Sequence, residues 1–200
     1  MRIAVLALAL ELAAGCSRRT QPPPPDPTAS PFAHPVGFRA GTIDAAACNA
    51  LVPPALATRL VFAQRTLVLA SFGSGAPRGT LTIAAPTTWV VPDVRAGAVQ
   101  GDEADGTFST IMVNTFDGDA DMTLDAVAGS GQISERTTRP DGAHVLVGRE
   151  AAPSRRAVIG VAWDRPGHRS IVCEAYLVEA LAAAVPAFVC ACGALTDSEP

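Results

Sequence analysis

Four of the five cysteines could carry chemistry in a folded domain: Cys48, Cys173, Cys190 and Cys192. In an oxidising compartment, an even number of cysteines favours two disulfides over metal thiolates. Because a Cys190–Cys192 bridge would close a very tight ring, we expect Cys48 and Cys173 each to join one member of that pair. A bridge from Cys173 would pin a helix to a sheet and contribute on the order of 3 kcal/mol.

The terminal pair also leaves two other kinds of chemistry open. Cys190 and Cys192 are separated by one residue and could be redox-active, or all four thiolates could bind zinc. Redox motifs are usually Cys-x-x-Cys at a helix start, whereas structural zinc sites favour two close pairs. A thiol redox or metal-binding role for Cys190 and Cys192 is therefore the alternative to a structural one.

Alternating carboxylates at Asp117, Asp119 and Asp121 have the spacing that begins a calcium loop. An EF-hand needs glycine at the sixth position and glutamate at the twelfth, where this sequence has Met122 and Ala128. An EF-hand is excluded, while an irregular calcium site stays open. The other interpretation is an acidic turn in which Asp121 caps the next helix.

Nucleophilic catalysis has little support in the sequence. We expect the three histidines in a tether, at a strand start and in a turn, in the order His34, His144 and His168. No Gly-x-Ser-x-Gly, Walker or dinucleotide fingerprint occurs, and the Gly-Ser-Gly at residues 129–131 is too short for the first pattern. We expect a protein that is not an enzyme and carries no cofactor.

Charge and length narrow the class of protein further. The 200 residues carry a formal net charge of -4, and 48% of them are hydrophobic. Without a leader and a linker, about 155 residues remain, which fits one domain with its own core. The basic pairs at residues 18–19 and 155–156 are isolated. Since nucleic-acid binding needs a basic stripe, we expect no nucleic-acid partner.

The N-terminus has the features of an export signal. Arg2 precedes an apolar run over residues 3–10, which fits a signal h-region of ~7–15 residues and is too short to span a bilayer. The sequence Leu-Ala-Ala-Gly-Cys at residues 12–16 resembles the lipobox of bacterial lipoproteins. That resemblance implies a signal peptide over residues 1–15 and a lipid on Cys16. An ordinary secretory leader is the alternative.

Residues 16–41 are expected to form a tether between the membrane and a folded domain. Residues 17–35 contain seven prolines, which favour an extended polyproline II chain without a core. Ser17 after the cysteine resembles outer-membrane lipoproteins of Gram-negative bacteria. The resemblance implies a cell-envelope location, lipid-anchored in the outer membrane and facing the periplasm or the cell surface.

The first half of the domain predicts helical turns followed by a hairpin. Asp44 is placed as an N-cap for a short helix through Leu51, and two prolines at residues 53–54 start another turn. Residues 65–72 and 79–84 are β-rich runs with glycines between them, which indicates paired strands. The Pro-x-x-Trp turn that follows should bury Trp89.

The second half predicts strands with one helix between them and one at the end. Residues 96–106 are acidic and glycine-rich and predict a loop, residues 107–115 a strand, and residues 122–128 a short helix. Three apolar runs predict an antiparallel meander over residues 143–149, 156–163 and 169–177. Residues 180–192 predict a buried helix interrupted at Pro186 and capped by Gly193.

This order of elements resembles the PsbP/DcrB-like fold of small exported lipoproteins. The resemblance rests on residues 80–89, which end in the Pro-x-x-Trp turn, and on residues 108–125 and 142–192. It implies a single α+β domain over residues 42–197, with an antiparallel sheet packed by helices. It also implies a non-catalytic binding or assembly module, whose partners are the membrane, through the lipid, and an unidentified envelope protein or small ligand.

Overall fold

The computed structural model describes residues 43–70, 77–92, 97–104 and 106–197. All of these residues belong to one compact unit of the chain. The expected signal peptide, the lipidation site Cys16, the proline-rich tether and His34 lie outside the described residues.

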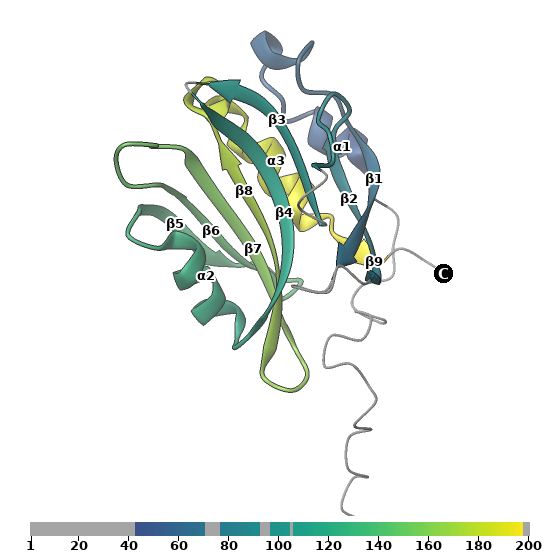
Figure 1. Ribbon diagram of the computed structural model, residues 1–200, viewed down its shortest axis with the longest axis vertical. Coiled ribbons are helices and arrows are strands. Elements are labelled where there is room, and N and C mark those ends of the chain that lie inside the picture. The colour runs from purple at the N-terminus through teal and green to yellow at the C-terminus, as the bar shows by residue number, and fades with distance from the viewer. Residues whose placement is uncertain (1–42, 71–76, 93–96, 105, 198–200) are drawn as a thin grey trace, which may run out of the picture. The chain divides into compact units, whose positions relative to one another are not determined.

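Six antiparallel strands form the larger sheet, in the order β3-β4-β8-β7-β6-β5 (Figure 1). In chain order the strands are β3 (Ala98–Ala104), β4 (Thr107–Asp117), β5 (Gln132–Thr138), β6 (His144–Arg149), β7 (Ala157–Arg165) and β8 (Arg169–Leu177). The predicted meander is confirmed as β6, β7 and β8. Gly167 and His168 make the turn between β7 and β8 with positive φ angles of 82° and 55°.

A second, smaller sheet contains β1 (Phe62–Ala70), β2 (Pro77–Pro86) and β9 (Thr196–Asp197) in the order β1-β2-β9. The predicted hairpin is confirmed, because β1 and β2 pair antiparallel. The sequence analysis predicted one sheet, and the structure has two. After β2 the chain turns at Pro86, where the Trp89 amide donates to the Pro86 carbonyl, and it enters the larger sheet at β3.

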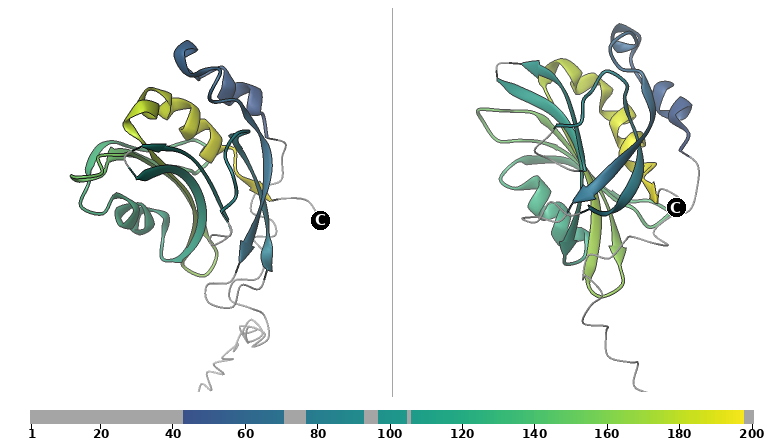
Figure 2. Two further views of the ribbon diagram at one scale, coloured as in Figure 1. Left: turned by 45° about the horizontal axis from the view of Figure 1, so that its top comes forward. Right: turned by 45° about the vertical axis from the view of Figure 1, so that its right-hand side comes forward.

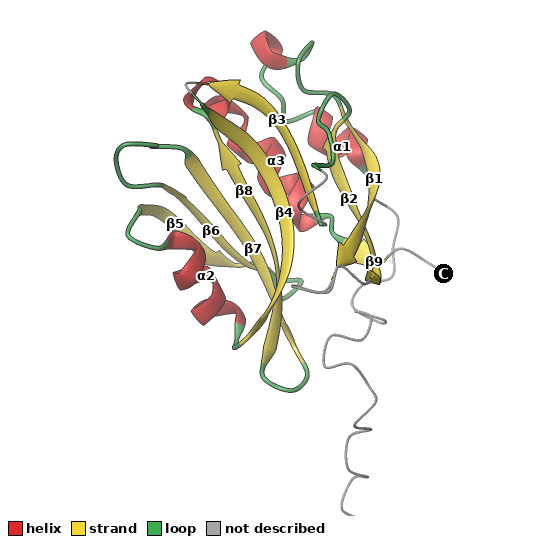
Figure 3. Cartoon of the chain, in the orientation of Figure 1, coloured by secondary structure: helices red, strands yellow, loops and turns green. Residues whose placement is uncertain are grey.

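The described residues form five helical segments beside the sheets (Figure 3). They are α1 (Ala45–Asn49), the 3-10 turn η1 (Pro54–Leu56), α2 (Ala120–Ala128), the 3-10 segment η2 (Glu179–Ala184) and α3 (Val185–Gly193). Helices α2 and α3 lie on opposite faces of the larger sheet (Figure 2). On β8, Val172 packs with α2, whereas Ile171 and Cys173 belong to the core that includes α3, because successive strand residues face opposite sides.

The main core lies between the two sheets and encloses α3. Phe188 of α3 is fully buried and contacts Phe62 edge-on, with ring centroids 5.1 Å apart. Trp89 is 2% exposed and packs against the same ring at 5.4 Å. The prediction that Trp89 is a core residue is confirmed.

The predicted loop over residues 96–106 is wrong, since most of it forms β3. Gly101 fits beneath the Trp89 side chain, and Asp102 takes a φ of 51° at a bulge in the pairing with β4. Acidic and glycine residues predict a turn locally, but pairing with β4 and packing of Trp89 supply the tertiary contacts that stabilise a strand here.

Two further boundaries differ from the sequence prediction. Helix α2 starts at Ala120, and its N-cap is Asp119, whose carboxylate accepts from the Met122 amide at 2.8 Å. The prediction that Asp121 caps this helix is wrong, because Asp121 already lies in the first turn. At the C-terminal helix the break falls between η2 and α3, with Pro186 in the first turn of α3, where its missing N–H costs no hydrogen bond.

Candidate functional site: the patch on β4 and β8

The four cysteines of the described domain form two disulfides. Cys48 of α1 bonds to Cys190 of α3, and Cys173 of β8 bonds to Cys192 of α3. The Cα atoms are 5.4 and 5.3 Å apart, within the usual range for disulfides. Each distant cysteine therefore joins one member of the terminal pair.

Helix α3 is held from two sides by these bonds. Residues two apart on a helix point in widely different directions, so Cys190 faces α1 while Cys192 faces the larger sheet. Cys192 and Cys173 are fully buried, and Cys190 is half-buried. The terminal pair thus joins three elements of the fold and does not close on itself.

The acidic residues after β4 hold helix α2 in place. Asp121 is hydrogen-bonded to the His144 ring at 3.1 Å, and this bond lowers the pKa of Asp121 from its ordinary value. Arg136 of β5 pairs with both Asp121 and Asp125 of α2. The Asp117 carboxylate oxygen Oδ1 lies 3.7 Å from Nε of Arg169. Within the described ranges, no group of three or more His, Cys, Asp or Glu side chains could hold a metal ion.

A second polar cluster lies on the α2-facing side of the larger sheet, beyond the part that α2 covers. Helix α2 packs against residues of β6, β7 and β8, and its buried cluster contains no residue of β4. The neighbouring part of this face carries polar and aromatic side chains, which we call the β4–β8 patch: Phe108, Asn114, Phe116, Arg156, Glu174 and Tyr176.

Glu174 is the buried centre of the β4–β8 patch. It is 5% exposed, yet it lies on β8 between apolar residues. Asn114 of β4 donates to one carboxylate oxygen at 3.0 Å, and the Tyr176 phenol donates to the other at 2.9 Å. Each oxygen keeps acceptor capacity beyond these two neutral donors.

Arg156 covers the Tyr176 ring at the rim of the patch. Its guanidinium carbon lies 4.9 Å from the ring centroid, and its nitrogens donate to both oxygens of Glu150 at 2.7 and 2.8 Å. A third nitrogen donates to the Phe108 carbonyl on β4 at 3.1 Å. This bidentate pair lowers the pKa of Glu150, while burial and the Glu174 carboxylate raise the pKa of Tyr176.

Aromatic side chains flank the polar centre along β4. Phe108 is 38% exposed and Phe116 is 37% exposed. Both lie on the same face as Asn114, since residues two apart on a strand point the same way. The β4–β8 patch therefore combines exposed apolar rings and hydrogen-bonding groups on strands β4 and β8 with the Arg156 guanidinium, which lies just before β7.

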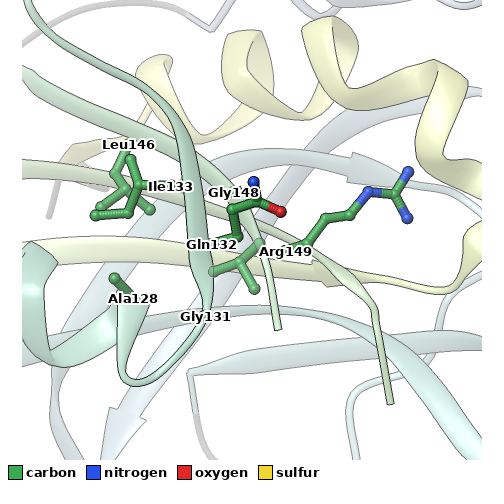
Figure 4. Close-up of a pocket in the computed structure, with 8 residues that line it drawn as sticks. Ala128, Gly131, Gln132, Ile133, Leu146, Gly148 and Arg149 are labelled. Carbon is green, nitrogen blue, oxygen red and sulfur yellow. The ribbon is translucent and has the colours of Figure 1, made fainter. Parts of the chain in front are cut away.

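A shallow depression occupies another part of the same face, at the C-terminal end of α2 (Figure 4). It is lined by Ala128, Gly131, Gln132, Ile133, Leu146, Gly148, Arg149 and Val158. It holds essentially no space that a water molecule could occupy, whereas ligand pockets typically enclose roughly 300–1,000 Å³. We therefore place the candidate site at the β4–β8 patch.

The sequence analysis did not identify the residues of the β4–β8 patch. One signal was present, because Glu174 is the only charged residue in the otherwise apolar run at residues 171–177. Its hydrogen-bond partner Asn114 is distant in the sequence, so only the pairing of β4 with β8 brings the two together. The predicted site residues Cys48, Cys173, Cys190 and Cys192 instead meet at α3.

No family model matches this chain, and no curated protein matches it either. No helix among the described residues is long and apolar enough to cross a membrane.

Proposed function

We propose that the protein is a non-catalytic lipoprotein of the cell envelope that binds an envelope protein or a small ligand through the β4–β8 patch. The observation that carries this proposal is the buried Glu174 carboxylate, held by Asn114 and Tyr176 beside the part of this sheet face that α2 covers. Burying a carboxylate beside neutral donors costs stability that an apolar residue would not cost, which indicates a role beyond packing.

The exposed rings fit the same role. Phe108 and Phe116 offer apolar contact area, and Glu174 and Arg156 offer oriented polar groups between and beside them. Binding surfaces commonly combine aromatic anchors with a few placed polar groups. Strands β4 and β8 hold Phe108, Phe116 and Glu174 with less freedom than loops would, so a ligand would lose little free energy in ordering them.

The anchoring part of the proposal rests on the N-terminal sequence. The apolar run at residues 3–10 and the lipobox-like residues 12–16 support export and lipidation of Cys16, followed by the tether. Two disulfides in the domain are typical of an oxidising compartment, which agrees with the envelope. We place the protein in the outer membrane, facing the periplasm or the cell surface.

The fold family is part of the same proposal. The α+β architecture with antiparallel sheets, helices and the Pro86–Trp89 turn supports a PsbP/DcrB-like domain. Binding modules on such a scaffold differ in their sites, so the ligand has to be sought at the patch and not in the fold.

Site-specific photo-crosslinking tests the binding role. A photoreactive residue at Phe108 should give a discrete adduct in native envelopes, whereas the same residue at Leu51, which is 48% exposed in the turn after α1, should not. Glu174→Gln should reduce the Phe108 adduct at least tenfold, and Glu135→Gln, an exposed carboxylate of β5 at the other edge of the sheet, should leave it unchanged. A Phe108 adduct whose yield is unchanged by Glu174→Gln would overturn the assignment of the patch. The absence of any Phe108 adduct would overturn it too.

Intact mass of the membrane-extracted protein, with and without reduction and alkylation, tests the anchor. We expect the mass of a diacyl or triacyl chain starting at Cys16 and no free thiol before reduction. An unlipidated chain would overturn the anchor but leave the binding patch standing. Two free thiols would instead favour the redox alternative, which the observed pairing of Cys190 and Cys192 with different partners does not support.

A further inference from the structure

Among the described strands, none pairs with the outer edge of β1. β1 is the terminal strand of the smaller sheet, and its nine residues pair with β2 on one side only. Gln64, Thr66 and Val68 are exposed along it, with Val68 at 50%. An edge of this length presents unpaired main-chain groups that another strand could use.

Two sets of hydrogen bonds fix which groups point outward. The Val61 carbonyl accepts from the Thr87 amide, so the main-chain N–H and C=O groups of the odd-numbered residues of β1 point toward β2. The N–H and C=O of Phe62 bond to the Asn49 carboxamide at 2.7 and 2.9 Å on the opposite side. Because main-chain groups alternate along an antiparallel strand, those of Gln64, Thr66 and Val68 also point outward.

These outward groups have no partner among the described strands. The Asn49 carboxamide bonds to both main-chain groups of Phe62, as a residue of a neighbouring strand would. Beyond it, the described residues supply no hydrogen bond to the outward groups of Gln64, Thr66 or Val68. The open stretch therefore spans five residues, starting two residues after the one that Asn49 caps.

The two edges of the larger sheet carry protecting features that β1 lacks. β5 has a bulge between Ile133 and Glu135, and Arg136 beside it pairs with α2. At the other edge, Gln100 of β3 is paired with Val90 through two main-chain bonds. Bulges, charges and covering segments are the usual means of preventing strand addition. In β1 the single charge is Arg65, and its guanidinium donates to the Trp89 carbonyl.

We infer that β1 pairs with β1 of a second copy of this chain, antiparallel and with the twofold axis at Thr66. In this register Gln64 lies opposite Val68 of the other copy, and Thr66 lies opposite its counterpart. The three outward residues of each copy then exchange their N–H and C=O groups, and the two smaller sheets become one.

The side chains favour this register over its neighbours. Arg65 lies opposite Leu67 of the other copy, so no like charges meet. A twofold axis at Arg65 would place two guanidinium groups side by side, which is unfavourable. Threonine opposite threonine is a favourable cross-strand pair. The contact is small, so membrane tethering, which raises the effective concentration, would support the dimer in the envelope.

Cysteine cross-linking of the full chain in membranes tests the register. Hydrogen-bonded antiparallel partners have Cα atoms about 5.5 Å apart, which suits a disulfide. We expect Thr66→Cys to give a covalent dimer on mild oxidation. Gln64→Cys alone should give no covalent dimer, since the two introduced cysteines would be offset by four residues along the strands, about 13 Å. Coexpressed Gln64→Cys and Val68→Cys chains should cross-link to each other. Thr87→Cys, exposed on the adjoining turn, is the collision control.

A proline at position 66 provides the second variant. The Thr66 N–H points away from β2, so Thr66→Pro should keep the β1–β2 hairpin and both native disulfides while blocking the edge. When the coexpressed Gln64→Cys and Val68→Cys chains both also carry Thr66→Pro, the cross-linking between them should fall at least tenfold. Equal cross-linking by Thr66→Cys and Thr87→Cys would overturn the dimer. A Thr66→Cys adduct with a different protein, in place of the dimer, would also overturn it.

Discussion

The Tyr176 phenol donates a 2.9 Å hydrogen bond to Glu174, two residues earlier on β8, where side chains two apart share a face. Burial and this carboxylate both raise the pKa of Tyr176 from its ordinary value near 10. The pair joins the most buried charge of the β4–β8 patch to the aromatic ring that Arg156 covers.

Titration of Tyr176 should report the integrity of the patch, because it is the only tyrosine in the sequence. In the native protein we expect no phenolate absorbance near 295 nm at pH 10 to 11, whereas the unfolded chain should ionise near pH 10. The unfolded state ionises first, so the stability of the fold should decrease as pH rises above about 10.

Glu174→Gln should lower the pKa of Tyr176 and leave it above the ordinary value, because burial remains the larger cause. Glu103→Gln is the matched control on an exposed carboxylate. Native ionisation of Tyr176 at pH 10 in the wild-type chain would contradict the buried hydrogen bond.

Gly160 lets α2 approach the larger sheet, and Gly160→Ala should destabilise the protein. An added Cβ would meet the Leu124 side chain at 2.5 Å, closer than carbon atoms pack. We expect a loss of about 1–3 kcal/mol in the free energy of unfolding, measured by urea denaturation. Leu124→Ala in the Gly160→Ala background should cost less than Leu124→Ala alone. If the losses in the free energy of unfolding of the two single variants simply add in the double variant, α2 can shift away from the sheet.

The two disulfides should be reduced in a fixed order. Cys190 is half-buried, whereas Cys173 and Cys192 are fully buried, so a thiol reductant should reach the Cys48–Cys190 bond first. Timed alkylation followed by peptide mass spectrometry should find label at Cys48 and Cys190 before the other two. Simultaneous labelling of all four would indicate that reduction requires global unfolding.

The Glu150–Arg156 pair should stabilise the protein above pH 5 and lose that effect in acid. Hydrogen bonds from Arg156 lower the pKa of Glu150, so its contribution is present above the unfolded pKa of about 4.3. It is lost as pH falls through the lower folded value. Glu150→Gln should therefore flatten the fall in melting temperature between pH 5 and pH 3. Glu103→Gln should leave the dependence of melting temperature on pH as in the wild type. An unchanged dependence in Glu150→Gln would exclude a stabilising contribution from the Glu150–Arg156 pair.

Local sequence patterns were sufficient where an element depends on its own residues. The apolar runs at residues 143–149, 156–163 and 169–177 predicted the meander, and Asp44 marked the start of α1, where it caps the helix. Periodicity and capping act over a few residues, so a single sequence reveals them. The same holds for the burial of Trp89 and for the interruption of the last helix near Pro186.

Contacts between distant residues decided the rest. β3 forms in an acidic, glycine-rich stretch because β4 pairs with it and Trp89 packs on Gly101. Cysteine number and spacing alone predicted disulfides, but only the packing of α3 between α1 and the larger sheet selects Cys190 for Cys48 and Cys192 for Cys173. The strength of such contacts depends on where the chain returns to itself, which no local pattern encodes. For the same reason Asn114 and Glu174 formed no motif in the sequence and meet only in the folded sheet.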